Sequence, residues 1–541
     1  MSTEICIDGD CVAYTNGHVY TVNKTHPWAE GFIVTPDGRF AAVGSTAEIL
    51  AKARQGSMAV YDLQGQFIMP GIHDAHVHTI ISGSGLTNWV QTGLDVNKEN
   101  IAHRVHQSAC ACAYSHAYED WLVGGAGFGF VDYDRSYLDE HYPETPVLLY
   151  GGGCHSWYAN TAALRRAGYD VDNELDVPHG EIVRRPDGSL TGELRDHAGC
   201  RMISAVPRPP IAHIKQVIKR AIVEMHRAGV TSCQDASATK LLLTALDELE
   251  KDGDLKMQFA THILYKNEWL TGEVMSPPDK LILDAEKYST RHVQTGFVKF
   301  MMDGACVPDL MSHSQVDSHD KPDMSKILLP NLNELIDRFD AKGMTCKIHC
   351  MGYGGSNLAL DVLEELRRKR PNGPRHEIAH CTQILNKDFP RFRKLNVTAE
   401  MSPAGSFDKR SQDEYFDMFR FDFPRMVEEE NHITIGSDWA HGAPLPLLPH
   451  VGKIAQTIGA EKTLEIITLA GVTAVGRGTE AGSIEVGKIA SFISVDRDLT
   501  EGDFANAKVL KTWFEGELVY DASSDSISWS NSPALDLVVA L

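Results

Sequence analysis

Short apolar segments alternate with longer amphipathic segments over most of this chain, from about residue 67 to residue 477. The short segments resemble buried strands, and the longer ones repeat apolar residues at helical spacing. The pattern predicts eight strands, at 67–74, 230–234, 257–263, 297–302, 345–349, 377–380, 397–401 and 433–437. It predicts helices between many of them, at 214–228, 241–251, 333–342, 358–369 and 462–470. Strands joined by helical crossovers predict an α/β fold, a (β/α)8 barrel, with a doubly wound open sheet as the alternative.

Both ends of the chain are predicted to be β structure. Turn-forming residues separate short strands at Asn16-Gly17, Pro36-Asp37-Gly38 and Glu515-Gly516. Neither end has enough strands for a sheet domain of its own. We therefore predict that residues 1–66 and 478–541 pair into one small β-sandwich domain, which leaves 67–84 and 208–477 for the barrel.

The first and second predicted barrel strands are too far apart in sequence for a simple crossover. Residues 85–207 are therefore predicted to form an inserted α/β lobe beside the barrel mouth. Within this segment the pattern predicts strands at 146–150 and 180–184 and helices at 99–118 and 161–167.

Composition narrows the classes of partner. The 541 residues include 51 Lys and Arg against 73 Asp and Glu, a net charge of −22, which argues against nucleic acid and anionic membrane surfaces. No apolar run is long enough to span a membrane, and the N-terminus lacks the pattern of a secretory signal. The 11 cysteines have no framework spacing, which favours reduced thiols. We expect a cytoplasmic protein with a small-molecule substrate, and a homodimer as the commonest oligomer.

Metal-capable residues stand at the ends of several predicted strands. His76 and His78 are two residues apart, so they share one face of the first strand. His349, His380 and Asp438 end the fifth, sixth and eighth strands. Each alone could be a hydrogen-bonded structural residue or a helix cap. Because a barrel builds its active site from the C-terminal ends of its strands, the set predicts one divalent metal site.

Lys299 lies inside an apolar segment, the fourth predicted strand. Burial disfavours its charge, and a neutral amine can react with carbon dioxide to give a carbamate that bridges two metals. The alternative is a lysine that reaches the barrel mouth or pairs with Asp303 or Asp438. From the residues alone, the alternative is favoured.

The predicted chemistry follows from these side chains. One or two divalent ions would lower the pKa of a water molecule and polarise a carbonyl. Asp438 would take the proton from that water and pass it to the leaving nitrogen. His349 and His380 would complete the metal site or hold the developing oxyanion.

Several stretches, in this order, resemble the metal-dependent amidohydrolase superfamily, in particular the branch that includes N-substituted formamide deformylases. They are Met69-Pro-Gly-Ile-His-Asp-Ala-His-Val-His, His155-Ser-Trp-Tyr-Ala-Asn-Thr-Ala-Ala-Leu, Gly188-Ser-Leu-Thr-Gly-Glu-Leu-Arg, Gly229-Val-Thr-Ser-Cys-Gln-Asp-Ala, Val298-Lys-Phe-Met-Met-Asp-Gly-Ala, Gly436-Ser-Asp-Trp and Gly482-Ser-Ile-Glu-Val-Gly-Lys-Ile-Ala-Ser-Phe. The resemblance implies a metal-binding barrel, a β-sandwich from both termini and an inserted domain. It also implies a ligand set of His76, His78, Lys299, His349, His380 and Asp438, with Lys299 as an N6-carboxylysine, which reverses the interpretation from the residues alone.

The chain departs from the pattern of that branch at several positions. Gly352-Tyr353-Gly354 replaces a Gly-Asp-Arg run, Ala379 replaces a Glu, Ser402 replaces a Gln before proline, and His73 is an extra histidine. These positions would line the pocket, so the substrate stays open. Residues expected to contact substrate are His155, Trp157, Asp303, Tyr353 and His441, with a core position as the alternative for Trp157 and a surface loop for His441.

The sequence thus predicts a metal-dependent hydrolase that cleaves an amide, formamide or cyclic amide bond of a small molecule. Zinc is the expected ion, with manganese, iron and nickel as alternatives. The competing functions are a deaminase of a ring amidine and a lactonase or esterase. A non-enzymatic alternative is an inactive barrel paralogue that serves as a binding or assembly subunit.

Overall fold

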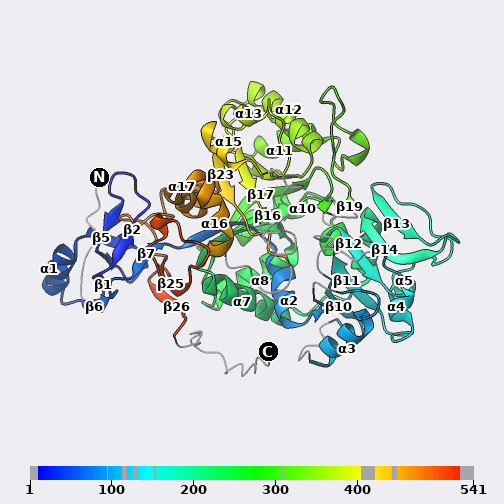
Figure 1. Cartoon of the computed structure of the whole chain (residues 1–541), viewed down its shortest axis with the longest axis horizontal. Coiled ribbons are helices and arrows are strands. Elements are labelled where there is room, and N and C mark those ends of the chain that lie inside the picture. Colours follow the sequence, from blue (N-terminus) through cyan, green and yellow to red (C-terminus); the bar gives the residue numbers. More distant parts are fainter. Residues whose placement is uncertain are drawn as a thin grey trace.

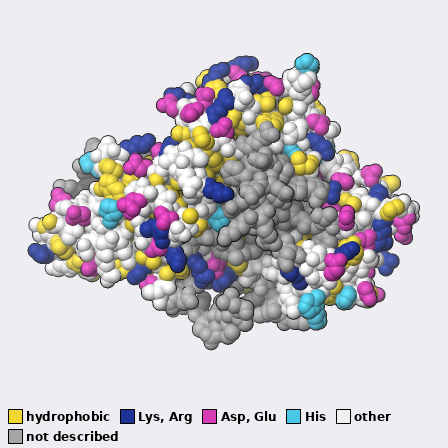
Figure 2. Space-filling view, in the orientation of Figure 1, with side chains coloured by type: hydrophobic (Ala, Val, Ile, Leu, Met, Phe, Trp, Pro, Cys, Tyr) yellow, Lys and Arg dark blue, Asp and Glu magenta, His cyan; other side chains and the backbone are white. Residues whose placement is uncertain are grey.

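The computed structural model describes residues 10–93, 96–111, 118–126, 132–151, 154–266, 268–307, 310–403, 421–440 and 447–523. Figure 1 shows three regions along the long axis: sheets from both chain ends, a central barrel, and a further sheet at the opposite side. No helix in the described part of the chain is long and apolar enough to cross a membrane. On the face in Figure 2, the described acidic and basic side chains are interspersed.

The central sheet contains eight parallel strands, as predicted. In spatial order they are β8 (Ile72–Val77), β15 (Val230–Ala238), β16 (Gln258–Leu264), β17 (Val293–Met301), β20 (Thr345–Cys350), β21 (Glu377–His380), β22 (Thr398–Met401) and β23 (His432–Ile435). The first and last strands meet where Asp438 N donates to His76 O at 2.8 Å, next to a parallel bridge between Val77 and Trp439. This nearly closed sheet confirms the (β/α)8 fold.

Helices cover the outside of the barrel (Figure 1). They include α2 (Thr79–Thr87), α7 (Ile211–Arg227), α8 (Lys240–Lys251), α11 (Leu332–Asp340), α12 (Tyr353–Lys369), α16 (Leu447–Ile458) and α17 (Ala460–Glu465). The α7 helix has the predicted periodicity, because Ile214, Ile218 and Ile222 are all buried on one side. Their side chains join the main apolar core outside the strands.

The predicted first strand, 67–74, is wrong as a single strand. Residues Phe67–Pro70 form β7, which pairs with β2 (His18–Tyr20) and β24 (Phe492–Val495) in a terminal sheet, and only β8 belongs to the barrel. Gly71 N donates to Ser491 O, whereas Ile72 N donates to Gly229 O. The chain therefore leaves one sheet for the other at Gly71, where a side chain would collide with Thr231. The apolar sequence continues across Gly71, so it gives no sign that the chain changes sheet there.

Strands from both chain ends form two sheets that enclose an aromatic core. One sheet contains β1 (Val12–Thr15), β4 (Gly31–Val34), β5 (Phe40–Gly44) and β6 (Ala59–Asp62); the other adds β3 (Trp28–Ala29), β25 (Val509–Phe514) and β26 (Glu517–Asp521) to β2, β7 and β24. Phe492 stacks on Trp513 with ring centroids 4.6 Å apart, and Phe32 packs against Phe492 at 4.8 Å. These contacts join the N-terminal and C-terminal segments.

Two of the three predicted turns are hairpins and one is not. The antiparallel pairs β4–β5 and β25–β26 confirm the turns at Pro36-Asp37-Gly38 and Glu515-Gly516. The hairpin at Asn16-Gly17 is wrong, because β1 and β2 belong to different sheets. Asn16 has a φ of 57° and its side chain donates to Asp62 at 2.9 Å. The turn thus passes the chain between sheets.

A separate six-stranded sheet lies between β8 and β15 in sequence. Its strands are β9 (Val90–Gln91), β10 (Leu122–Gly125), β11 (Val147–Gly151), β12 (Ser156–Ala159), β13 (Gly180–Arg184) and β14 (Leu190–Asp196). The predicted strands at 146–150 and 180–184 are present, as is a helix, α5 (Thr161–Arg166). The division of the chain into three domains at the stated boundaries stays a prediction.

Candidate metal centre

His76 lies at the C-terminal end of β8, with both ring nitrogens inside the barrel. Its Nδ1 lies 2.6 Å from Glu400 Oε2 on β22. A carboxylate accepts this hydrogen bond, so Nδ1 carries the proton and Nε2 keeps its lone pair. His76 is 1% exposed, and its Nε2 has no hydrogen-bond partner among the described residues. A buried nitrogen in this state is ready to bind a ligand.

His78 and Asp438 complete the tightest group. Ser237 Oγ lies 2.8 Å from His78 Nδ1, and the other ring nitrogen lies 3.2 Å from Asp438 Oδ1. The same Asp438 oxygen is 3.6 Å from His76 Nε2. One ligand atom from each of His76, His78 and Asp438 lies within 4.8 Å of the others. Two imidazoles and a carboxylate at this spacing fit a divalent ion.

His380 and His349 extend this group across the barrel end. His380 Nδ1 is 3.8 Å from Asp438 Oδ2, and its ring centroid is 4.8 Å from that of His76. The rings of His349 and His380 are 4.4 Å apart. Asp438 and His380 have φ values of 50° and 74°, in the left-handed region that non-glycine residues rarely adopt. Such backbone strain is concentrated at functional sites.

Lys299 on β17 is buried beside this group. It is 2% exposed, and its Nζ has no hydrogen-bond partner among the described residues. The structure records no ion pair from Lys299 to Asp303 or Asp438, the alternative drawn from the sequence. Burial, reinforced by the charge of Lys347, lowers the pKa of Lys299 to about 8. A substantial part of these amines is therefore neutral near physiological pH.

Burial sets the charge of the other residues in this site. It lowers the pKa of His76, His349 and His380 well below the usual range, with Lys299 or a neighbouring histidine adding to the effect. For Asp438 burial acts in the opposite sense, but the hydrogen bond and charge of His78 lower its pKa overall. Neutral imidazoles and an ionised carboxylate are the forms that bind metals. The residues present therefore fit a divalent ion.

Comparison with protein families shows the family to which this chain belongs. A family model described as "Amidohydrolase family" matches residues 59–520. The chain belongs to the amidohydrolase family. As a member, it is a hydrolase that acts on carbon–nitrogen bonds other than peptide bonds.

Two curated relatives and one solved structure resemble this amidohydrolase over nearly its whole length. It is 25% identical over 548 residues to Protein LONG AFTER FAR-RED 3 of Arabidopsis thaliana, covering 94% of this chain and 91% of that protein. It is 23% identical over 555 residues to N-substituted formamide deformylase of Arthrobacter pascens, covering 94% and 97%. An uncharacterized metal-dependent hydrolase from Pyrococcus furiosus, at 20% identity, covers 91% of this chain and 100% of its own, with a TM-score of 0.68. That likeness shows a shared fold.

Two of the residues predicted to contact substrate lie next to the histidine group. His155, on the segment between β11 and β12, has its ring centroid 5.6 Å from that of His349. Its Nδ1 lies 2.8 Å from Asp196 Oδ1, and both residues are buried. Asp303 lies 4.0 Å from His349, but it is 0% exposed and accepts backbone N–H groups of Ser314, Met351 and Gly352. Asp303 thus holds the segment after β20.

The other expected contact residues lie elsewhere. Trp157 is 0% exposed in the core of the six-stranded sheet, packed against Gly199, which is the core position named as its alternative. Tyr353 is half-buried at the start of α12. His441 lies outside the described residues. The extra His73 is buried below the metal-capable group, beside Ser232 at 2.8 Å.

The sequence interpretation missed Glu400 and Ser237, which orient His76 and His78. Glu400 is 0% exposed and also accepts a hydrogen bond from Ser402. Burial raises the pKa of Glu400 to about 7. A charged residue inside the apolar strand 398–401 was the available signal. Ser237 carried no such signal, because its role depends on where β15 places it.

Proposed function

We propose that this amidohydrolase is a metal-dependent enzyme that cleaves an amide, formamide or cyclic amide bond in a small molecule. One observation carries the proposal. At the C-terminal end of the barrel, the imidazoles of His76, His78 and His380 surround Asp438, while the buried His76 Nε2 and Lys299 Nζ have no hydrogen-bond partner among the described residues. Buried polar atoms are rarely left in this state without a ligand.

The proposed ion is zinc, which suits imidazole and carboxylate ligands. His76, His78 and Asp438 would hold one ion, since their ligand atoms already lie within 4.8 Å. His349, His380 and Lys299 would hold a second. In this scheme the neutral Lys299 amine attacks carbon dioxide, an N–C bond forms, and the amine proton passes to solvent. The product would be a carbamate anion at Lys299, which would offer oxygen ligands to a divalent ion beside His349 and His380.

A bound divalent ion lowers the pKa of water and polarises the substrate carbonyl. The side chains move the protons. Asp438, kept ionised by His78, accepts the proton of the attacking water and then gives it to the leaving nitrogen. With a single ion bound, His349 and His380 would instead stabilise negative charge on the former carbonyl oxygen. His155, oriented by Asp196, contacts the substrate beside His349.

A product assay tests this function directly. Chelated protein and protein reloaded with zinc, manganese, iron or nickel would be given N-substituted formamides, other amides, cyclic amides, a ring amidine and a lactone. Formate or another carboxylate, the amine and ammonia would be measured separately. We expect a carboxylate and an amine in equal amounts, only with reloaded protein, and a kcat lowered by about 10²–10⁴-fold in Asp438→Asn.

Other products would contradict the proposal in defined ways. Ammonia without a new carboxylate would assign a deaminase. Turnover of the lactone alone would assign a lactonase or esterase. Folded, reloaded protein that turns over none of these compounds would support the binding-subunit alternative.

A further inference from the structure

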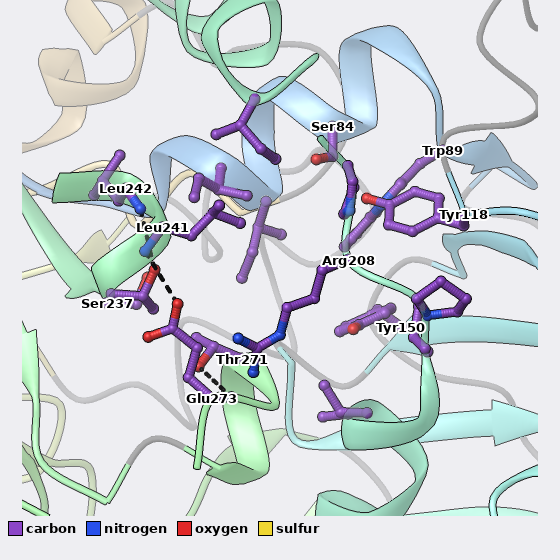
Figure 3. A pocket seen from close by; sticks show the side chains of 18 of the residues that line it. Ser84, Trp89, Tyr118, Tyr150, Arg208, Ser237, Leu241, Leu242, Thr271 and Glu273 are labelled. Atoms are coloured by element: carbon purple, nitrogen blue, oxygen red, sulfur yellow. Dashed lines mark hydrogen bonds between the residues drawn. The ribbon is translucent and has the colours of Figure 1, made fainter. Parts of the chain in front are cut away.

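A cavity lies beside the metal centre, between the barrel and the six-stranded sheet (Figure 3). Its volume is about 110 Å³. The barrel side comes from α2, the end of β15 and the start of α8, and the opposite side includes Trp89, Tyr118 and Tyr150. None of the six proposed metal ligands lines it. The cavity is therefore a site separate from the metal centre.

The walls of this cavity favour an aromatic or short apolar body. Trp89 stacks on Tyr150 with ring centroids 4.6 Å apart, and each is 7% exposed. Ile81, Ile214 and Leu242 complete the apolar lining. A dry cavity of about 150 Å³ is known to hold benzene, so this partly open space takes a single ring or a short chain.

The polar groups in the cavity select the charge of its occupant. Both carboxylates are already used: Asp235 accepts the N–H groups of Thr79 and Ser237, and Glu273 accepts those of Lys240 and Leu241. Arg208 reaches between Glu273 and the aromatic wall in Figure 3. A guanidinium has five N–H donors, and the bond recorded for Arg208 goes to Gly272 O at 2.8 Å. Because backbone N–H groups already occupy Asp235 and Glu273, the remaining donors of Arg208 are the groups that can bind a carboxylate.

Ser84 supplies an independent indication of a ligand. It lines the cavity, is 1% exposed, and its Oγ has no hydrogen-bond partner among the described residues. A buried hydroxyl without a partner is unfavourable, and an acceptor on a ligand would relieve that cost. The occupant would thus carry a second acceptor or bring a water molecule.

The cavity also touches the support of the metal site. Ser237 lines it, and the Ser237 hydroxyl lies 2.8 Å from His78 Nδ1. Groups that orient a metal ligand set its affinity for the ion. We propose that this cavity binds a small carboxylate with one ring or a short apolar chain, and that its occupant acts on the metal centre through Ser237. Binding of the carboxylate in the cavity does not depend on the proposed function, whereas the coupling rests on the proposed metal site.

Binding can be tested with benzoate as the probe and benzyl alcohol as its neutral match, by titration calorimetry on the full-length chain. We expect saturable benzoate binding that is at least about tenfold weaker in Arg208→Met and at least about tenfold tighter than that of benzyl alcohol. Arg165→Met is the matched control, since Arg165 is also exposed and does not line the cavity. Equal benzoate affinity in wild type and Arg208→Met, or no saturable binding, would overturn the site.

The coupling has its own readout, which does not depend on turnover. In the wild type, zinc affinity measured by competition with a chelator should change when benzoate is added. In Ser237→Ala, whatever its own zinc affinity, adding benzoate should cause no change. An unchanged zinc affinity in the wild type would overturn the coupling even if benzoate binds. A protein that binds benzoate and zinc but hydrolyses nothing would contradict the proposed function alone.

The carboxylate could be part of a substrate or product, or a separate effector. Once a substrate is found, competitive inhibition by benzoate would assign the cavity to the substrate. Inhibition or activation that alters kcat without competing would assign an effector.

Discussion

Two buried lysines lie side by side on neighbouring barrel strands, but their surroundings differ. Lys299 on β17 and Lys347 on β20 are register partners, 2% and 0% exposed. Lys347 Nζ donates to Ala75 O at 2.6 Å and Gln234 Oε1 at 2.5 Å, and lies 3.5 Å from Glu377. Lys299 Nζ has no hydrogen-bond partner among the described residues. A satisfied buried charge supports the fold, whereas an unsatisfied one indicates a function.

The interactions of Lys347 extend below the metal centre. Glu377 also lies 3.1 Å from His262, so Lys347, Glu377 and His262 connect β20, β21 and β16. Through Ala75 and Gln234, Lys347 further connects these strands to β8 and β15. We call Lys347, Glu377, His262 and Gln234 the lower layer. His76, His78, His349, His380, Asp438 and Lys299 form the upper layer. The lower layer fixes the strands that present the upper one.

The largest expected effect is on turnover in the upper layer. Asp438→Asn keeps the shape of the side chain but removes the proton acceptor, so we expect kcat to fall by about 10²–10⁴-fold. Thermal melting of the metal-free variant should match that of wild type. A variant that keeps wild-type kcat would remove Asp438 from the chemistry.

In the lower layer the largest effect is on stability. Lys347→Met leaves the Glu377 carboxylate without its cation, and we expect the free energy of unfolding to fall by about 3–5 kcal/mol. Lys299→Met is the matched control. It replaces an amine that has no hydrogen-bond partner in the described part of the chain with an apolar group, so the metal-free protein should stay within about 1 kcal/mol of wild type. Urea unfolding of both variants checks the contrast, and equal losses would contradict it.

A smaller effect, on zinc affinity, is expected from Glu400, which orients the metal-capable His76. Glu400→Gln keeps a hydrogen-bond acceptor for His76 Nδ1 but removes the negative charge. Zinc affinity, measured by chelator competition, should weaken by about 10–100-fold while the fold is retained. Wild-type affinity in this variant would show that Glu400 does not tune His76.

Acid should weaken the lower layer. Burial, with the charge of Lys347, lowers the pKa of His262 to about 4, whereas the unfolded value is about 6.5. Below pH 6.5 the unfolded chain binds a proton that the native chain does not, so stability falls between about pH 6.5 and pH 4, by about 2 kcal/mol at pH 5. His262→Gln should lose less stability than wild type between pH 7 and pH 5 in urea unfolding. Equal losses would show that His262 does not titrate as described.

The barrel and most of its upper layer could be predicted from the sequence, for a physical reason. Strand ends carry histidine and aspartate after apolar runs, and one fold rule places all those ends together. His76, His78, His349, His380 and Asp438 were therefore predictable without coordinates. Lys299 was not, because an isolated lysine in a strand has an ordinary explanation, and only the family resemblance favoured a functional one.

The remaining features depend on partners that sequence does not name. The change of sheet at Gly71 lies inside a continuous apolar run, and the turn at Asn16 has the composition of a hairpin although it joins two sheets. Glu400 and Ser237 acquire their roles from residues more than a hundred positions away. Lys347 depends on the distant Ala75 and Gln234 as well as on the nearer Glu377. The cavity beside His78 is assembled from the barrel and the six-stranded sheet together.

Metal content per chain would show whether Lys299 serves the metal centre, in contrast to Lys347, which serves the fold. Wild type and Lys299→Met would be purified without added metal, dialysed against zinc, and examined by elemental analysis alongside thermal melting. We expect roughly two ions per wild-type chain and at most about one in the variant, with unchanged melting of the metal-free forms. Equal metal content in the two proteins, or a folded wild type that takes up none, would contradict it.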